Sequence, residues 1–244
     1  MSPKIVLISG ASRGIGAATA KLLASQGYAV CVNYQHNKTA AHEVVQHIKA
    51  HGGHALAYQA DVSCESQVVD LFNFMDTELG TITHLVNNAG ILLPQAKLVD
   101  MDAQRINHIL STNVTSYFLC CREALKRMQT GSAIVNVSSG AARTGSPYEY
   151  IDYAASKGAI DTLTKGLSLE VAQQGIIVNG VRPGFIHTDM HADGGEPNRI
   201  QRLSPQIPLQ RGGTTDEVAN AITWLLSEQA SYVTGSIIDV TGGK

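Results

Sequence analysis

Tyr153 and Lys157, four residues apart, have side chains whose types and spacing suit proton transfer. In a helix, residues at this spacing lie on one face and within mutual reach. A nearby ammonium favours a phenolate, so we expect Lys157 to lower the pKa of Tyr153 from its ordinary value of about 10. Such a tyrosine could act as a general acid. The neighbouring Tyr148 and Tyr150 have no lysine at that spacing, although an isolated pair of this kind is often only a packed ring beside a solvated lysine.

Two serines, Ser138 and Ser139, follow an apolar run at 133–137 that we expect to be a strand. A hydroxyl here could hydrogen-bond the oxygen that receives the proton. Side chains alternate along a strand, so the two hydroxyls should point to opposite faces. The residues alone leave open which serine belongs to the site.

A glycine-rich turn from Gly10 to Gly16 joins a short apolar run at 4–9 to a helix-forming segment at 17–25. Strand, glycine turn and helix in this order let the backbone approach a pyrophosphate, and the helix N-terminus offers free N–H groups to it. We therefore expect a dinucleotide, although glycines also end strands and begin turns.

Strands and helices are expected to alternate along the rest of the chain. Further strands are predicted at 28–34, 54–59, 84–87, 133–137, 176–181 and 236–240, and helices at 39–50, 65–79, 102–128, 153–174 and 215–227. This pattern predicts an α/β fold, a Rossmann-type doubly wound parallel sheet of about seven strands flanked by helices, with residues 1–244 forming a single domain. The segment 185–210 holds three prolines and two adjacent glycines, so we expect a long flexible substrate loop outside the core.

Composition excludes several classes of protein. The 244 residues carry a net charge of −2, and the Lys and Arg residues are scattered, so we expect neither nucleic acid nor a membrane surface as partner. The N-terminus lacks the features of a signal peptide and no apolar run could span a bilayer, which favours a cytoplasmic location. The four cysteines and nine histidines show no metal-binding spacing, so we expect reduced thiols and no metal.

Taken together and in this order, several motifs resemble the short-chain dehydrogenase/reductase family over nearly the whole chain. They are Ser9-Gly10-x-x-x-Gly14-x-Gly16, Asn87-Asn88-Ala89-Gly90, Asn113, Ser139, Tyr153-x-x-x-Lys157 and Pro183-Gly184. The sequence is most similar in kind to bacterial NADPH-dependent carbonyl reductases, a group that includes β-ketoacyl carrier protein reductases and glucose dehydrogenase-like enzymes.

The resemblance implies an oxidoreductase that transfers a hydride between a nicotinamide cofactor and a carbonyl/alcohol substrate. Tyr153 would be the general acid/base, Lys157 would lower its pKa and hold the nicotinamide ribose, Ser139 would bind the substrate oxygen, and Asn113 would anchor a water for proton relay. The cofactor would contact Gly10, Ser12, Arg13, Gly14, Ile15, Gly16, Asn33, Tyr34, Asp61, Val62, Asn88, Ala89, Gly90, Tyr153, Lys157, Pro183, Gly184, Ile186 and Thr188.

Two departures from the family pattern stand out. Ser9 replaces the usual threonine and keeps its hydroxyl. Ser139 precedes Tyr153 by fourteen positions, one more than the commonest spacing, so the loop through 147–150 is extended and the choice between Ser138 and Ser139 stays open. The family's usual position favours Ser139.

The tip of the second strand bears on the choice of cofactor. An acid there would grip the ribose hydroxyls and repel a 2′-phosphate, and the segment 32–38 contains none. Arg13, Lys38 and Asn33 could face that phosphate, so we expect NADP(H) to be favoured over NAD(H), unless both cations are ordinary solvated charges.

The residues are compatible with more than one class of substrate and of function. A β-ketoacyl thioester or a sugar is an alternative to a simple carbonyl compound, and a catalytically silent dinucleotide sensor or scaffold is a second class of function. The resemblance also implies a homo-oligomer, a dimer or tetramer, for which Ala155, Ala159, Leu163 and Leu167 could form a contact face or could belong to the core.

Overall fold

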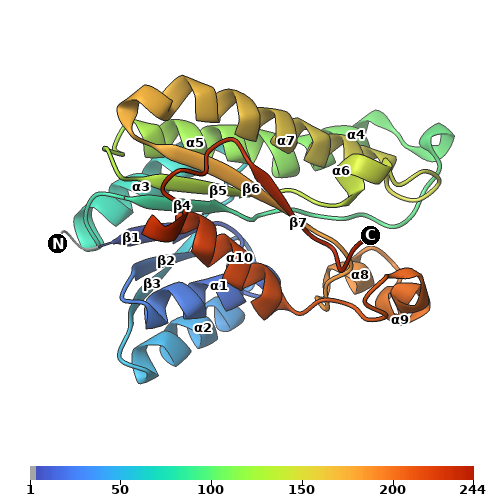
Figure 1. Cartoon of the computed structure of the whole chain (residues 1–244), viewed down its shortest axis with the longest axis horizontal. Coiled ribbons are helices and arrows are strands. Elements are labelled where there is room, and N and C mark those ends of the chain that lie inside the picture. Colours follow the sequence, from blue (N-terminus) through green and yellow to red (C-terminus); the bar gives the residue numbers. More distant parts are fainter. Residues whose placement is uncertain (1–3) are drawn as a thin grey trace.

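A computed structural model describes residues 4–244 as a parallel seven-stranded sheet with helices on both faces (Figure 1). The strands lie in the order β3-β2-β1-β4-β5-β6-β7, and all neighbouring strands are parallel. Their bounds are β1 Ile5–Ile8, β2 Ala29–Tyr34, β3 His54–Gln59, β4 His84–Asn87, β5 Ala133–Val137, β6 Ile177–Pro183 and β7 Ile237–Val240. The predicted α/β fold is confirmed, including each of the seven strands.

The strand order reverses at β1, which pairs with β2 on one side and with β4 on the other. In open α/β sheets, ligands bind at the carboxyl ends of the strands beside such a reversal. The residues predicted to act follow β1, β4, β5 and β6. The sheet therefore brings them to one edge of the molecule, although they are far apart in the sequence.

Six of the seven longer helices of residues 4–244 cover the sheet in two layers (Figure 1). The seven are α1 Gly14–Ser25, α2 Lys38–Ala50, α3 Glu65–Glu78, α4 Ala103–Leu110, α5 Ser116–Leu125, α7 Ile151–Val171 and α10 Thr215–Leu226. Helices α1, α2 and α10 pack on one face, below the sheet in Figure 1, and α3, α5 and α7 pack on the other. The sheet needs apolar side chains on both faces because both are covered, and β1 and β5 are accordingly buried along their whole length.

The long helix predicted over 102–128 is wrong in one respect. A π-helical turn at Ser111–Thr115 separates α4 from α5. The hydrophobic pattern continues through the turn, so periodicity alone did not reveal it. Such turns insert a residue into a helix and are frequent at functional sites. Here the turn carries Asn113, which is buried.

The segment 185–210 is another correction, because much of it is regular and packed. It contains α8 Met190–Asp193, α9 Arg199–Leu203 and a 3₁₀ turn at Ser204–Gln206. Ile186, Ile200, Leu203 and Ile207 are buried. The prolines and glycines correctly indicated interrupted structure, but they concealed apolar residues that join this segment to the rest of the fold.

Two further findings concern the part of the chain that the structure describes. All four cysteines are free thiols, three of them buried. None of the helices combines the length and the apolar character needed to cross a bilayer.

Candidate active site

The catalytic candidates Tyr153 and Lys157 lie on the first two turns of α7, as predicted. The Lys157 side chain is buried beneath the end of β5, where its Nζ donates to the Val137 carbonyl at 2.8 Å and to the Tyr117 hydroxyl at 3.3 Å. Nζ also lies 5.8 Å from the centroid of the Tyr153 ring. The helix therefore places the ammonium and the phenol side by side at the carboxyl edge of the sheet.

The pKa of Tyr153 differs from our expectation. Burial raises it above 10.0, and a hydrogen bond with the Ser139 side chain only partly offsets that increase. Burial also lowers the pKa of Lys157 to about 7, although the Asp161 carboxylate opposes this change. A lysine that is partly neutral at pH 7 has less charge with which to stabilise a phenolate. The raised pKa of Tyr153 favours the protonated phenol, the form that a proton donor requires.

The two serines point in different directions, as alternation along β5 predicted. The Ser138 hydroxyl is buried and donates to the main-chain carbonyl of Lys157 at 3.1 Å. The Ser139 hydroxyl accepts the Ala141 N–H at 3.1 Å, and this side chain is close enough to Tyr153 to lower the pKa of the phenol. Only Ser139 therefore shares a face with the phenol. Ser138 instead ties the strand to the catalytic helix.

Asn113 makes three side-chain hydrogen bonds. Its Oδ1 accepts the Ile91 N–H at 2.8 Å, and its Nδ2 donates to the Ile91 carbonyl at 3.0 Å and to the Ser156 hydroxyl at 3.2 Å. A Cβ at Gly90 would lie 3.5 Å from both Asn113 Oδ1 and Lys157 Nζ. Asn113 thus holds the segment after β4 beside the catalytic helix. Its predicted role in binding a water stays a prediction.

The glycine turn packs against the segment that follows β4. Gly10 has a φ of +62°, and a Cβ on it would lie 3.0 Å from Cα of Ala89. A Cβ at Gly16 would lie 2.6 Å from Asn88 Nδ2 and 2.7 Å from the Gly10 carbonyl oxygen. Only glycine fits such gaps without moving backbone.

Polar side chains hold this turn in place. The Ser9 hydroxyl accepts the N–H groups of Asn88 and Ala89, and Asn88 Nδ2 donates to the carbonyls of Ser9 and Gly10. Replacing the family's threonine by Ser9 therefore keeps the hydroxyl that receives these two bonds. Because the turn leads directly into α1, the N-terminal N–H groups of that helix face the same crevice.

The prediction that Asn33 faces the 2′-phosphate needs correction, because its side-chain amide already bonds main-chain groups. Asn33 is buried at the end of β2, where Oδ1 accepts the Gly10 N–H at 3.3 Å and Nδ2 donates to the carbonyls of Tyr58 and Ala60. It braces the glycine turn and cannot also donate to a phosphate. Tyr34 is likewise buried, within the core beneath α1 and α2.

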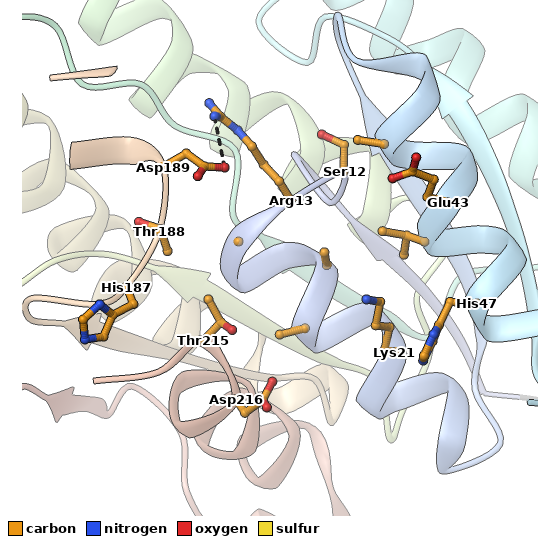
Figure 2. Close-up of a pocket in the computed structure, with 15 residues that line it drawn as sticks. Ser12, Arg13, Lys21, Glu43, His47, His187, Thr188, Asp189, Thr215 and Asp216 are labelled. Atoms are coloured by element: carbon orange, nitrogen blue, oxygen red, sulfur yellow. Dashed lines mark ion pairs between the residues drawn. The ribbon is translucent and has the colours of Figure 1, made fainter. Parts of the chain in front are cut away.

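Arg13 is held by acids that the sequence did not pair with it. Its guanidinium forms ion pairs with Asp189, at 3.5 Å, and with Asp193 of α8. Figure 2 shows the Asp189 pair at the edge of a groove of about 550 Å³, which Ser12, Gly14 and Thr188 also line. About half of the Arg13 side chain remains exposed, so it can exchange partners.

The other predicted contact residues surround the same edge. Asp61 accepts the N–H and hydroxyl of Ser63 after β3, and Val62 is buried beside it. Pro183 ends β6, and a Cβ at Gly184 would lie 2.9 Å from Cα of Thr241. The remaining residues, all partly or fully buried, are Ile15 at the start of α1 and Ile186 and Thr188 after β6. A Cβ at Gly14 would lie 3.5 Å from Thr188, which joins the two predicted cofactor segments.

Sequence reasoning missed a second set of residues on the opposite side of Tyr153. Arg105 of α4 donates to Asp152 at 2.8 Å, and the other oxygen of this carboxylate accepts the Tyr153 N–H. Tyr117 supports Lys157, as described above. Arg199 of α9 is buried among acids and aromatic rings. No short-range pattern marks these residues, because each meets its partner only after folding.

Within residues 4–244, no three His, Cys, Asp or Glu side chains gather where they could hold a metal ion.

Comparison with known proteins agrees with this fold. A family model described as enoyl-(acyl carrier protein) reductase matches residues 10–244. The chain is 62% identical over 245 residues to the uncharacterized oxidoreductase YgfF of Escherichia coli (strain K12), covering 98% of this chain and 99% of the relative. It is 39% identical over 242 residues to the 3-oxoacyl-[acyl-carrier-protein] reductase FabG of Staphylococcus aureus (strain Mu50), covering 98% and 97%.

Solved structures share the fold at lower sequence identity. A dehydrogenase/reductase from Sinorhizobium meliloti 1021 has a TM-score of 0.94 at 31% identity, covering 100% of this chain and 95% of the other. A short-chain dehydrogenase from Burkholderia cenocepacia J2315 in complex with NADP has a TM-score of 0.91 at 32% identity, covering 98% and 97%. The fold and the glycine turn define a nucleotide-dependent oxidoreductase. The chain belongs to the short-chain dehydrogenase/reductase family.

Proposed function

We propose that this enzyme reduces a carbonyl group to an alcohol with NADPH, using Tyr153 as the proton donor. The observation that carries the proposal is the convergence of Ser139, Tyr153 and Lys157 at the carboxyl ends of β5 and β6, beside Gly90 and Asn113. A hydroxyl, a protonated phenol and an ammonium around one point suit an oxygen that gains negative charge as the reaction proceeds.

The crevice fits a dinucleotide on three grounds. First, the backbone packing at Gly10 and Gly16 leaves no room for a Cβ. Second, α1 begins directly at the glycine turn. Third, Thr188 of the segment after β6 lies next to Gly14 of this turn. These are the features that let a backbone approach a pyrophosphate. When bound, the reduced nicotinamide supplies the hydride.

The chain's own residues would handle the proton. The Ser139 hydroxyl donates to the substrate oxygen and orients it. Tyr153 transfers its phenolic proton to that oxygen, and the Lys157 ammonium stabilises the phenolate that remains. Ser138 and Asn113 position the reacting groups. Ser138 fixes the end of β5 to α7, and Asn113 holds the segment after β4. In the oxidative direction Tyr153 accepts the proton instead.

Preference for NADPH is supported by the absence of an acid at the tip of β2 and by the exposed cation Arg13. Because the side-chain amide of Asn33 already bonds main-chain groups, Arg13 and Lys38 remain as the candidates to bind a 2′-phosphate. Arg13 would leave Asp189 and Asp193 to bind it. FabG of Staphylococcus aureus is named a 3-oxoacyl-[acyl-carrier-protein] reductase, so a 3-oxoacyl compound is the first substrate class to test.

Assembly into a dimer or tetramer belongs to the same proposal. Leu163 packs at the margin of the core and Leu167 within it, whereas Ala155 is exposed on α7. Phe118 of α5 is 52% exposed and adds apolar surface to that layer of helices. Light scattering of the purified protein would give a mass of two or four chains. A stable monomer would contradict the proposal.

The test of function is a substrate panel followed by the loss of NADPH absorbance, repeated with NADH. The panel contains aldehydes, ketones, 3-oxoacyl thioesters and sugars. We expect turnover of at least one carbonyl class, with a higher kcat/KM for NADPH than for NADH. Tyr153→Phe should reduce kcat by about 100- to 10,000-fold because it removes the proton donor. NADPH affinity should be unchanged.

Each result has a defined consequence. Binding of NADPH without turnover of any class would support a silent sensor instead of an enzyme. An active Tyr153→Phe variant would exclude Tyr153 as the donor. A higher kcat/KM with NADH would overturn the cofactor assignment while leaving the reaction class intact.

A further inference from the structure

Arg199 occupies a position that the proposed reaction does not use. Its side chain is only 8% exposed, which is unusual for an arginine unless charged partners surround it. Nη1 and Nη2 bond the two oxygens of Glu149, and Nη1 also donates to Glu196 at 2.7 Å. The guanidinium carbon lies 5.0 Å from the centroid of the Tyr150 ring and 5.6 Å from that of Phe185. Arg199 is therefore held by acids at its edge and by aromatic rings at its faces.

These partners come from separate segments around the site. Glu149 and Tyr150 belong to the loop between β5 and α7, the loop that is one residue longer than usual. Phe185 follows β6, and Glu196 precedes α9 in the segment predicted to contact substrate. A single side chain thus joins two connections, β5 to α7 and β6 to α10, at the carboxyl edge of the sheet.

Other contacts extend this network to a third segment, which follows β4. Gln95, after β4, donates to Glu196 at 2.9 Å, and the Ala96 N–H donates to the Glu149 carbonyl at 3.0 Å. The Tyr150 hydroxyl donates to the Gly194 carbonyl at 3.1 Å. All of these segments meet next to the first turn of α7, which bears Tyr153.

Strain in the extended loop requires such an anchor. Ser146 and Tyr148 have φ values of +41° and +67°, in the left-handed region that favours glycine. Backbone in this region persists only where its surroundings hold it. The fork between Arg199 and Glu149 immediately follows these two residues, so it is well placed to keep the loop in this conformation.

We propose that Arg199 is a positioning residue for substrate: it clamps the 194–203 segment to the Glu149–Tyr150 turn and so fixes the wall of the substrate pocket. The inference rests on the proposed carbonyl reductase function. Arg199 does not itself bind an anionic substrate group, because Glu149 and Glu196 already engage it. Hydrogen bonds from Arg202 and Arg199 lower the pKa of Glu196 to about 2, so this acid stays charged at neutral pH.

The test variant is Arg199→Lys, which keeps the charge but loses the planar fork. We expect KM for a neutral β-ketoester, ethyl acetoacetate, to rise about tenfold, since the fork contributes hydrogen bonds between charged groups. The KM for free acetoacetate should rise equally, because the wall as a whole has moved. The kcat value and NADPH affinity should remain at the wild-type level.

Arg202→Lys is the matched control. Arg202 lies on the same helix and also bonds Glu196, but 51% of its side chain is exposed. Hydrogen exchange followed by mass spectrometry gives a readout independent of activity. In Arg199→Lys, amides in 190–206 and 146–150 should exchange faster, while those of α7 and the glycine turn should not change. Arg202→Lys should leave both KM and exchange near wild type.

The outcomes separate this proposal from the proposed function. Unchanged exchange in both segments would overturn the clamp, whatever the enzyme catalyses. A rise in KM confined to acetoacetate would mean that Arg199 binds anions directly, and a fall in kcat alone would place it in the chemistry; either result overturns the positioning role. A wild-type enzyme inactive on every carbonyl would overturn the proposed function, and faster exchange in Arg199→Lys would then still support the clamp.

Discussion

The glycine turn on the cofactor side and the loops on the substrate side are held together by different kinds of contact. On the cofactor side, Gly10, Gly16, Ser9, Asn33 and Asn88 are positioned by close backbone packing and by neutral hydrogen bonds to main-chain groups. On the substrate side, charged side chains from separate loops bond one another, as Arg199 does with Glu149. Main-chain partners leave little freedom for change, whereas side-chain partners can be exchanged. The first side suits a common ligand, and the second suits substrates that differ from one relative to another.

Replacing one glycine by alanine on each side tests this difference. The variant on the cofactor side should show the largest effect of all, a loss of NADPH affinity. Gly16→Ala would place its Cβ 2.7 Å from the Gly10 carbonyl and 2.9 Å from Cα of Ala11, so backbone must move. We expect NADPH affinity, measured by fluorescence titration, to fall by more than about 100-fold. In Gly194→Ala the nearest atoms are side-chain atoms, Leu92 Cδ2 at 2.7 Å and the Tyr150 hydroxyl at 3.2 Å, which can shift.

Gly194→Ala should therefore leave NADPH affinity intact and alter KM for the carbonyl substrate only modestly. Circular dichroism must show that both variants are folded. Equal losses of NADPH affinity in the two variants would remove the distinction between the sides.

The same difference explains how much of the molecule could be predicted from its sequence. Strands β1 to β7, the glycine turn and the pair Tyr153 and Lys157 depend on hydrophobic pattern and spacing over a few residues. The π turn around Asn113, the engaged amide of Asn33 and the clamp at Arg199 depend on partners that lie far away in the sequence. For example, 50 residues separate Arg199 from Glu149. A local pattern carries no record of such contacts.

The next prediction concerns Ser138 and Ser139, only one of which we expect to contact the substrate oxygen. Ser139→Ala should lower kcat/KM by about 10- to 100-fold, because it removes a hydrogen bond to an oxygen that gains charge. Ser138→Ala should lose only the bond to the Lys157 carbonyl, which would lower the free energy of unfolding by about 1 kcal/mol.

Steady-state kinetics and urea unfolding of both variants would measure these effects. The two substitutions of this matched pair are at adjacent positions directly after β5. Loss of activity in Ser138→Ala with wild-type activity in Ser139→Ala would reverse the assignment.

The smallest expected effect concerns the next turn of the catalytic helix, where Asp161 binds Arg182 at 2.9 Å. Burial lowers the pKa of Lys157 to about 7, and Asp161 raises it. Asp161→Asn should therefore lower this pKa further, so that the ammonium is lost at a lower pH. If the reaction needs the ammonium, the fall in kcat on the alkaline side should begin at a lower pH than in the wild type, with less than about a tenfold change in kcat at pH 7. Asp239→Asn is the control, because it also loses a bond to Arg182 but does not act on Lys157. A pH profile of kcat that moves equally in both variants, or moves in neither, would mean that Asp161 does not set the charge of Lys157.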